Sequence, residues 1–172
     1  LEPLRPSGRF SSLCSIENIM FKSIIAAVAS IALATPGFAA SWQDVKQLGE
    51  LVKGTGTTIT MKECKDSRAG SYQFQKDVID ELTICTDNVD MNDADAVWET
   101  LVHESVHVMQ ACAGDNIVKL EYQPRILREI KAHAPHYYEI LSGYPAASKL
   151  RETEAFWMEL QSPEVSIKWI QD

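Results

Sequence analysis

The amino-acid sequence predicts an α+β fold, in which a small antiparallel sheet is followed by a mostly helical half. Short runs rich in β-branched and aromatic residues lie between residues 57 and 86, whereas apolar residues recur at helical spacing from residue 93 onward. The chain has 172 residues, of which 45% are hydrophobic and 23% are charged. These values are ordinary for one soluble globular domain and exclude a disordered or collagen-like chain.

The first predicted element is a helix over residues 41–54. Ser41 is a good N-cap, apolar residues follow at helical spacing, and Gly54 ends the pattern. Turn residues then separate short segments of β-forming composition, which we expect to pair as the antiparallel sheet. These strand-like segments lie at 57–61, around Tyr72 and Phe74, and at 82–86.

The helical half begins with the strongest predicted helix, which runs from about residue 93 to residue 113. Asn92 or Asp93 can cap its N-terminus, and Gly114 can end it. Prolines and a glycine divide the remaining sequence into shorter helices. We expect these helices between Pro124 and Pro135, through Tyr138 and Leu141 up to Gly143, at about 147–160, and from Pro163 through Ile170.

Residues 20–40 have the composition of a secretory signal peptide. Met20 and Lys22 precede an apolar run at 24–34, and small residues follow up to Ala40. The run is shorter than the about 20 residues that span a membrane, although an uncleaved anchor is an alternative. We therefore expect an upstream extension outside the fold, a signal peptide, and a single secreted or periplasmic domain without stable membrane association after cleavage. Their boundaries are 1–19, 20–40 and 41–172.

The charge balance excludes some classes of partner. The chain has 16 basic and 24 acidic side chains, which give a formal net charge of −8. Since no basic stripe runs along the sequence, we expect neither nucleic acid nor an anionic membrane surface as a partner.

The cysteines predict a disulfide, because an exported chain reaches an oxidising compartment. Cys64 and Cys85 each lie in a strand-like segment with turn residues between them, so we expect a Cys64–Cys85 bond. Cys112 falls on the apolar face of the long helix, where a buried thiol is expected. Pairing of Cys112 with either of the other two cysteines is the alternative.

Residues 103–107 of the long helix read His-Glu-Ser-Val-His, an HExxH motif. Residues four apart share one helix face, so the imidazoles of His103 and His107 can bind one ion. Gln110 falls in the same sector, whereas mostly apolar side chains line the opposite side. One face can therefore pack in the core while the other presents both histidines. The adjacent Glu104 can act as a general base on a water activated by that ion.

The motif resembles that of the zincin metallopeptidases, within a region of about residues 57–160. The metzincin extension is absent, because Gln110 and Ala113 occupy its glycine and third-histidine positions. The sequence is more similar to the gluzincins, in which a later helix supplies a glutamate, often directly before an alanine. Glu154-Ala155 matches that pattern. The resemblance therefore implies Glu154 as the third ligand, with Glu152 as the first alternative and Glu159, His133 and His136 behind it.

The resemblance implies an exported zinc-dependent peptidase that uses Zn²⁺ as cofactor, acts on a peptide or protein substrate, and has Glu104 as general base. Zincins often hold the developing oxyanion with a tyrosine or histidine, and the sequence does not choose among several candidates. These candidates are His133, His136, Tyr137, Tyr138 and Tyr144. The alternatives to an enzyme are a non-catalytic zinc-binding module and a metal-free exported interaction domain.

Overall fold

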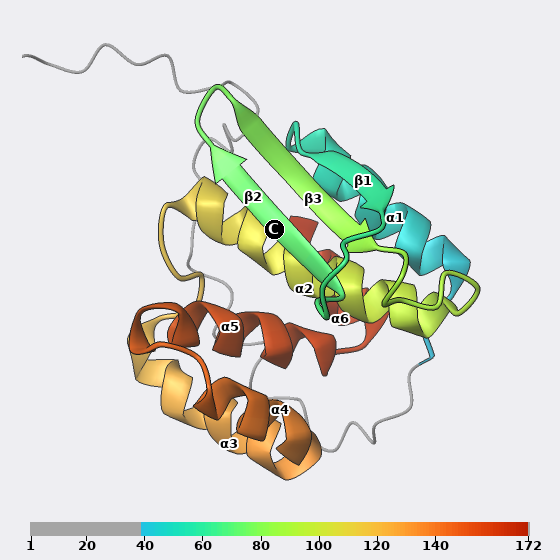
Figure 1. The fold of residues 1–172 in the computed structure, drawn as a ribbon. Helices are drawn as coiled ribbons and strands as arrows, with labels where there is room; N and C mark the ends of the chain where they lie inside the picture. The colour runs from blue at the N-terminus through green and yellow to red at the C-terminus, as the bar shows by residue number, and fades with distance from the viewer. Residues whose placement is uncertain (1–38, 172) are drawn as a thin grey trace, which may run out of the picture.

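The computed structural model describes residues 39–171, so the expected upstream extension and nearly all of the expected signal peptide lie outside the described residues (Figure 1). Within that range the predicted α+β class is confirmed, with one helix and the sheet followed by a helical half. The elements are α1 (Trp42–Gly54), β1 (Thr58–Lys62), β2 (Gly70–Gln75), β3 (Ile79–Cys85), α2 (Ala94–Ala113), the short 3₁₀ helix η2 (Leu120–Tyr122), α3 (Gln123–His133), α4 (Pro135–Ser142), α5 (Ala146–Glu159) and α6 (Pro163–Gln171).

The sheet is mixed rather than antiparallel, with the strand order β1-β3-β2. The antiparallel prediction is right for β2 and β3, in which Gly70 lies opposite Ile84, but wrong for β1 and β3, which run parallel. After β1 the chain crosses the end of β3 through the loop 63–69 and starts β2 on the other side. Two strands that follow one another in sequence are therefore separated by the third, which segment composition alone does not reveal.

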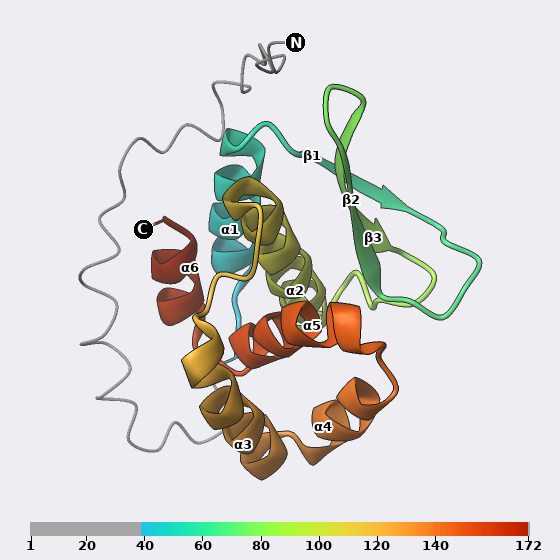
Figure 2. The ribbon, with the colours of Figure 1, turned by 90° about the vertical axis from the view of Figure 1, so that its left-hand side faces the viewer.

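Helix α2 is the central element of the molecule. It packs against α1, α5 and α6 and against strands β2 and β3, and Figure 2 shows the helices gathered on one side of the sheet. Apolar residues of α1, β3 and α2 meet in the core beside it. Members that are at most 1% exposed include Leu48, Val52, Leu82, Ile84, Val102 and Val106.

Pro124 opens a helix as predicted, and Pro135, which was predicted to end that helix, also begins the next one. Pro124 lies in the first turn of α3 and Pro135 in the first turn of α4, where a missing N–H costs nothing because it has no helical partner. Both helices lie beneath α5 in Figure 1, and both pack against neighbouring elements of this half. The longest of the expected helices, α2, begins after the predicted cap Asp93 and ends at Gly114.

The predicted Cys64–Cys85 disulfide is confirmed, with the two Cα atoms 5.3 Å apart. It lies where the loop 63–69 crosses the end of β3. The expectation of a buried thiol at Cys112 is wrong in both respects, because this residue is exposed and its sulfur is part of a disulfide. It lies near the C-terminal end of α2, where the core no longer covers the helix. No cysteine among residues 39–171 is free.

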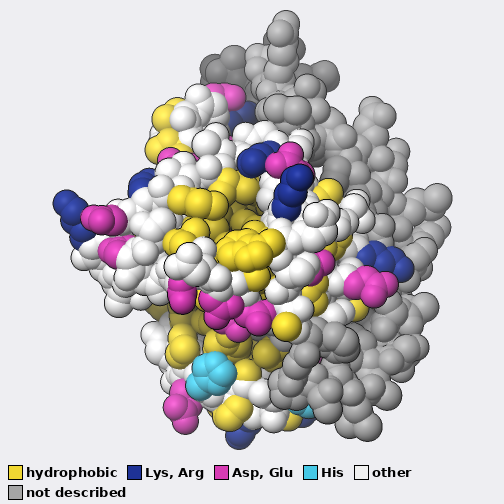
Figure 3. Space-filling view, turned by 90° about the vertical axis from the view of Figure 1, so that its right-hand side faces the viewer, with side chains coloured by type: hydrophobic (Ala, Val, Ile, Leu, Met, Phe, Trp, Pro, Cys, Tyr) yellow, Lys and Arg dark blue, Asp and Glu magenta, His cyan; other side chains and the backbone are white. Residues whose placement is uncertain are grey.

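The surface carries both apolar and charged side chains. On the face shown in Figure 3, hydrophobic side chains gather at the centre, acidic side chains lie along the lower edge of this group, and basic side chains are scattered. Within residues 39–171, no helix has both the length and the apolar character that crossing a bilayer demands.

Candidate metal centre

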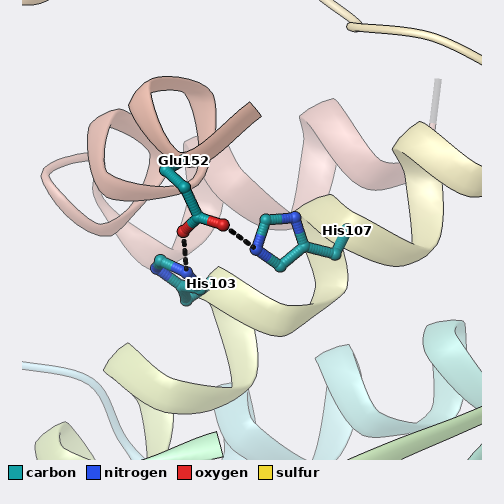
Figure 4. Close-up of side chains that lie close together, drawn as sticks. All are labelled: His103, His107 and Glu152. Carbon is teal, nitrogen blue, oxygen red and sulfur yellow. Dashed lines mark ion pairs between the residues drawn. The ribbon is translucent and has the colours of Figure 1, made fainter. Parts of the chain in front are cut away.

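Two histidines one turn apart on α2 form the centre of the site. Asp93 caps α2 by accepting a hydrogen bond from the backbone N–H of Asp95, and Gly114 ends it with φ at 73°. The helix is therefore continuous through His103 and His107, and both imidazoles point toward α5 (Figure 4). Their side chains are 14% and 17% exposed, so they are mostly enclosed yet still reach solvent.

Glu152 of α5 completes the group, and Figure 4 shows its carboxylate facing both rings. Its Oε2 atom is 3.4 Å from Nε2 of His103, and its Oε1 atom is 3.7 Å from Nε2 of His107. One potential ligand atom from each of the three residues lies within 4.8 Å of the other two. The described part of the chain thus brings both predicted histidine ligands to the carboxylate of Glu152.

The structure does not bring Glu154, the predicted third ligand, to the histidines. Successive residues of an α-helix are rotated by about 100°, so positions two apart point to nearly opposite sides. Since α5 turns Glu152 toward His103 and His107, it turns Glu154 away from them. Glu152, the first alternative in the sequence analysis, therefore lies where the glutamate-alanine pattern predicted Glu154.

Glu154 instead anchors a buried hydrogen-bond network. It is 2% exposed. Its Oε2 atom accepts from Nε2 of Gln110 at 2.8 Å and from the N–H of Ile117 at 3.0 Å. Its Oε1 atom accepts from the N–H of Val118 at 3.1 Å and from Nε2 of Gln123 at 2.9 Å. Four N–H donors occupy this carboxylate, so it is committed to joining segments of the fold.

Each histidine is oriented through its Nδ1 atom. Nδ1 of His103 lies 2.5 Å from Oε1 of Glu159, and Nδ1 of His107 lies 2.8 Å from Oε1 of Gln110. Carboxylate and amide oxygens only accept, so each Nδ1 carries a hydrogen, and in the neutral ring each Nε2 keeps a lone pair. When an imidazole binds a metal through one nitrogen, an acceptor at the other nitrogen fixes the orientation of the ring and its tautomer.

The sequence did not assign these orienting roles, although two spacings could have suggested them. Gln110 follows His107 by three residues and shares its sector of α2. Glu159 follows Glu152 by seven residues, which is about two helical turns, so both lie on the same stripe of α5.

The charges around the histidines favour a cation. Burial acts to lower the pKa of His103, but the neighbouring Glu152 and Glu159 outweigh it and raise this pKa to about 10. Burial acts to raise the pKa of Glu152, but its interactions with the two histidines outweigh it and lower this pKa to about 2. The metal-free site therefore holds a proton on His103 between carboxylates, and a divalent ion can replace that proton.

Glu104 lies next to the histidines and beneath strand β2. It is 6% exposed, and burial raises its pKa while the two histidines oppose this shift. A Cβ atom at Gly70 would come within 3.0 Å of Cγ of Glu104 and 2.7 Å of Cγ2 of Thr100. The absence of a side chain at Gly70 therefore lets β2 lie directly on this part of α2.

Of the candidate oxyanion donors, Tyr144 is the one that lies beside the Glu152 carboxylate. Burial raises the pKa of its hydroxyl, and the negative charge of Glu152 raises it further. Tyr137 lies instead near Glu159. Burial and the charge of Glu159 raise the pKa of the Tyr137 hydroxyl. The ring centroid of Tyr137 is 4.8 Å from that of Phe156.

The other three candidates are exposed. His136 packs against Tyr137 with the ring centroids 4.2 Å apart, and the ring of Tyr138 lies 5.0 Å from Nζ of Lys131. His133 lies in the last turn of α3. None of the three belongs to the group formed by His103, His107 and Glu152.

Comparison with known proteins identifies a family without an assigned activity. No curated protein and no solved structure matches this chain. A family model described as "Domain of unknown function (DUF8637)" matches residues 45–171, a range that includes the two histidines, Glu104 and Glu152. Because this match covers well over half of the sequence, the chain belongs to the DUF8637 family.

Proposed function

We propose that this protein is a zinc-dependent hydrolase that cleaves peptide bonds, with the ion held by His103, His107 and Glu152. The observation that carries the proposal is the convergence of these three side chains from two helices, with both Nε2 atoms facing one carboxylate. Two histidines and a carboxylate form a ligand set that catalytic zinc sites use.

The distances are close to those between the ligand atoms of one shared ion. Ligand atoms of a tetrahedral zinc centre lie about 3.3–3.4 Å apart, since each is about 2.0–2.1 Å from the ion. The two separations between histidine nitrogens and Glu152 oxygens are 3.4 and 3.7 Å. Both exceed the usual N–H···O range of about 2.7–3.2 Å. The side chains are thus close enough to share an ion, which would take the place of the proton that pairs His103 with Glu152 in the metal-free site.

The ion would supply Lewis acidity, which lowers the pKa of a bound water and polarises a substrate carbonyl. Glu104 is next to the first histidine and has a pKa raised by burial, so its carboxylate can take a proton and deliver it to a leaving amine. The hydroxyl of Tyr144 can donate a hydrogen bond to the oxygen that gains negative charge.

A peptide substrate is supported by the strand that lies over Glu104. Within the described residues β2 is an edge strand, because it pairs with β3 on one side alone. An exposed edge can bind an extended peptide through backbone hydrogen bonds. Since Gly70 of β2 packs against Glu104, a peptide added there would pass close to the general base.

The test is to measure zinc content and peptide hydrolysis in the same preparations. We expect about one zinc per chain in the parent protein, by mass spectrometry, and cleavage of a peptide library that stops with chelator. Replacing Glu104 with Gln should keep the zinc and lower the rate by about 10²–10⁴-fold, because proton transfer is lost.

Glu129→Gln is the matched control, since Glu129 bonds to Trp157 and Arg125 rather than to the site. It should hydrolyse peptides at the parent rate. Equal hydrolysis by the Glu104→Gln variant and the parent would overturn the role of Glu104. Zinc binding without any hydrolysis would instead support the non-catalytic zinc module.

A further inference from the structure

We propose that Gln110 and Glu154 are positioning residues that hold His107 in its metal-binding form, with the hydrogen on Nδ1 and the lone pair on Nε2. The inference rests on the proposed metal site. It concerns a pair of buried polar side chains that neither the HExxH motif nor the ligand set includes.

The orientation of the Gln110 amide follows from its partners. Gln110 is fully buried. Its Nε2 atom donates to the backbone oxygen of Arg151 at 3.1 Å and to Oε2 of Glu154 at 2.8 Å. Both partners accept only, so the NH₂ group must face them and Oε1 must face His107. Turning the amide over would place its oxygen against a carbonyl oxygen and a carboxylate, with no donor between them.

The orientation of Gln110 decides which nitrogen of His107 carries the hydrogen. Since Oε1 of Gln110 can only accept at 2.8 Å, Nδ1 of His107 must donate to it. In a neutral imidazole the other nitrogen, Nε2, then has no hydrogen, and it is the atom that faces Glu152 at 3.7 Å. The reversed amide would favour the opposite tautomer, in which Nε2 cannot bind a metal.

Glu154 is itself fixed from several directions. The N–H groups of Ile117 and Val118 come from the loop after α2, and the amide of Gln123 comes from α3. Because donors surround the Glu154 carboxylate, it can neither rotate nor offer a donor to Gln110. The loop and α3 therefore influence the tautomer of His107 through Glu154 and Gln110.

The first test replaces Gln110 with Met, which has a similar length but lacks the amide. The tautomer of His107 is read in the metal-free full chain from ¹⁵N-histidine NMR spectra at mildly alkaline pH, and zinc affinity is measured by competition with a chromophoric chelator. We expect Nδ1–H in the parent, loss of that preference in the variant, and zinc binding weakened by about 10–100-fold. The control Glu129→Gln should match the parent in both measurements.

The second test replaces Gln110 with Glu and does not depend on the Met variant folding. An oxygen at position 110 can still accept from Nδ1 of His107, so the parent tautomer should be kept. The same change removes the donor toward Glu154 and the Arg151 carbonyl oxygen and sets two carboxylates against each other, so the melting temperature should fall. A merely structural role of Gln110 would affect the tautomer alike in the Met and Glu variants.

Two results would overturn the inference. One is a Gln110→Met protein that keeps both the parent tautomer and the parent affinity. The other is a Gln110→Glu protein that loses the parent tautomer as fully as Gln110→Met does. If the parent binds no zinc, the proposed metal site fails, but the NMR measurement still decides whether Gln110 and Glu154 set the tautomer.

Discussion

Helices α2 and α5 both supply the candidate metal centre, but they do so in different ways. The contribution of α2 is local, because His103, Glu104 and His107 are adjacent or one turn apart. The contribution of α5 depends on how this helix is rotated against its neighbours. Spacing within one helix can therefore be predicted from sequence, whereas the face that a second helix turns toward it depends on packing.

Burial along α5 explains why its orientation is hard to predict. Glu152, Phe156 and Glu159 lie on one stripe that faces α2, and the ring of Phe156 packs edge-on against His103 with centroids 4.8 Å apart. Yet every residue from Thr153 to Met158 is buried. No polar face marks the outside of this stretch, so amphipathic patterning cannot indicate which glutamate points at the histidines.

The largest expected effect is the difference between Glu152 and Glu154 in what their replacement does to zinc binding. Glu152→Gln should weaken zinc binding by more than about 100-fold, because the carboxylate proposed to bind the ion is removed. Loss of a side chain that only hydrogen-bonds to a metal ligand costs about 10–100-fold. Glu154→Gln should retain measurable zinc but lose about 1–3 kcal/mol of unfolding free energy, because a buried donor loses its acceptor. Isothermal titration and urea unfolding measure the two quantities. Complete zinc loss in Glu154→Gln with full binding in Glu152→Gln would restore Glu154 as the ligand.

The second effect concerns Glu159 of α5, whose carboxylate orients His103 of α2. Glu159→Gln should weaken zinc binding by about 10–100-fold, since the carboxylate that accepts from Nδ1 of His103 is replaced by a neutral amide. Competition with a chelator gives the affinity, and Glu129→Gln again serves as control. An unchanged affinity would show that His103 needs no charged partner.

Features that depend on local interactions could be predicted from the sequence. These features are the caps of α1 and α2, the proline that opens α3, the shared helix face of His103 and His107, and the Cys64–Cys85 bond, which depend on short stretches or strong residue preferences. Features that depend on tertiary packing could not be predicted in this way. The parallel pairing of β1, the exposure of Cys112 and the place of Glu154 each depend on elements that are distant in sequence.

The third effect concerns the contact of the sheet with α2. Gly70→Ala should cost about 1–3 kcal/mol of unfolding free energy, because its Cβ would meet Cγ2 of Thr100 at 2.7 Å and the backbone oxygen of Thr83 at 2.9 Å. Gly54→Ala is the matched control, because a Cβ there has nothing within 4 Å. Urea unfolding compares them, and equal stability of the two variants would contradict the close packing of β2 on α2.

The smallest effect lies in the loop that leads into β2. The N–H groups of Cys64 and Lys65 bond to the Asp87 carboxylate and lower its pKa below 3.8. Its stabilisation is therefore present above pH 3.8 and is lost as the pH falls through the lower folded value. Asp87→Asn should slightly lower the melting temperature at neutral pH, and this difference should disappear in acid. A difference that persists in acid would mean that the charge is not responsible.

The strand order has a consequence for the sequence of events in folding. Strands β2 and β3 form a hairpin in which Gln75 lies opposite Ile79. Strand β1 also pairs with β3, although β2 lies between them in sequence. Local contacts close faster than distant ones, so the hairpin should form first and β1 should join it afterwards. Cys64 follows β1 and Cys85 ends β3, so formation of their disulfide would link β1 to β3 after the two strands have paired.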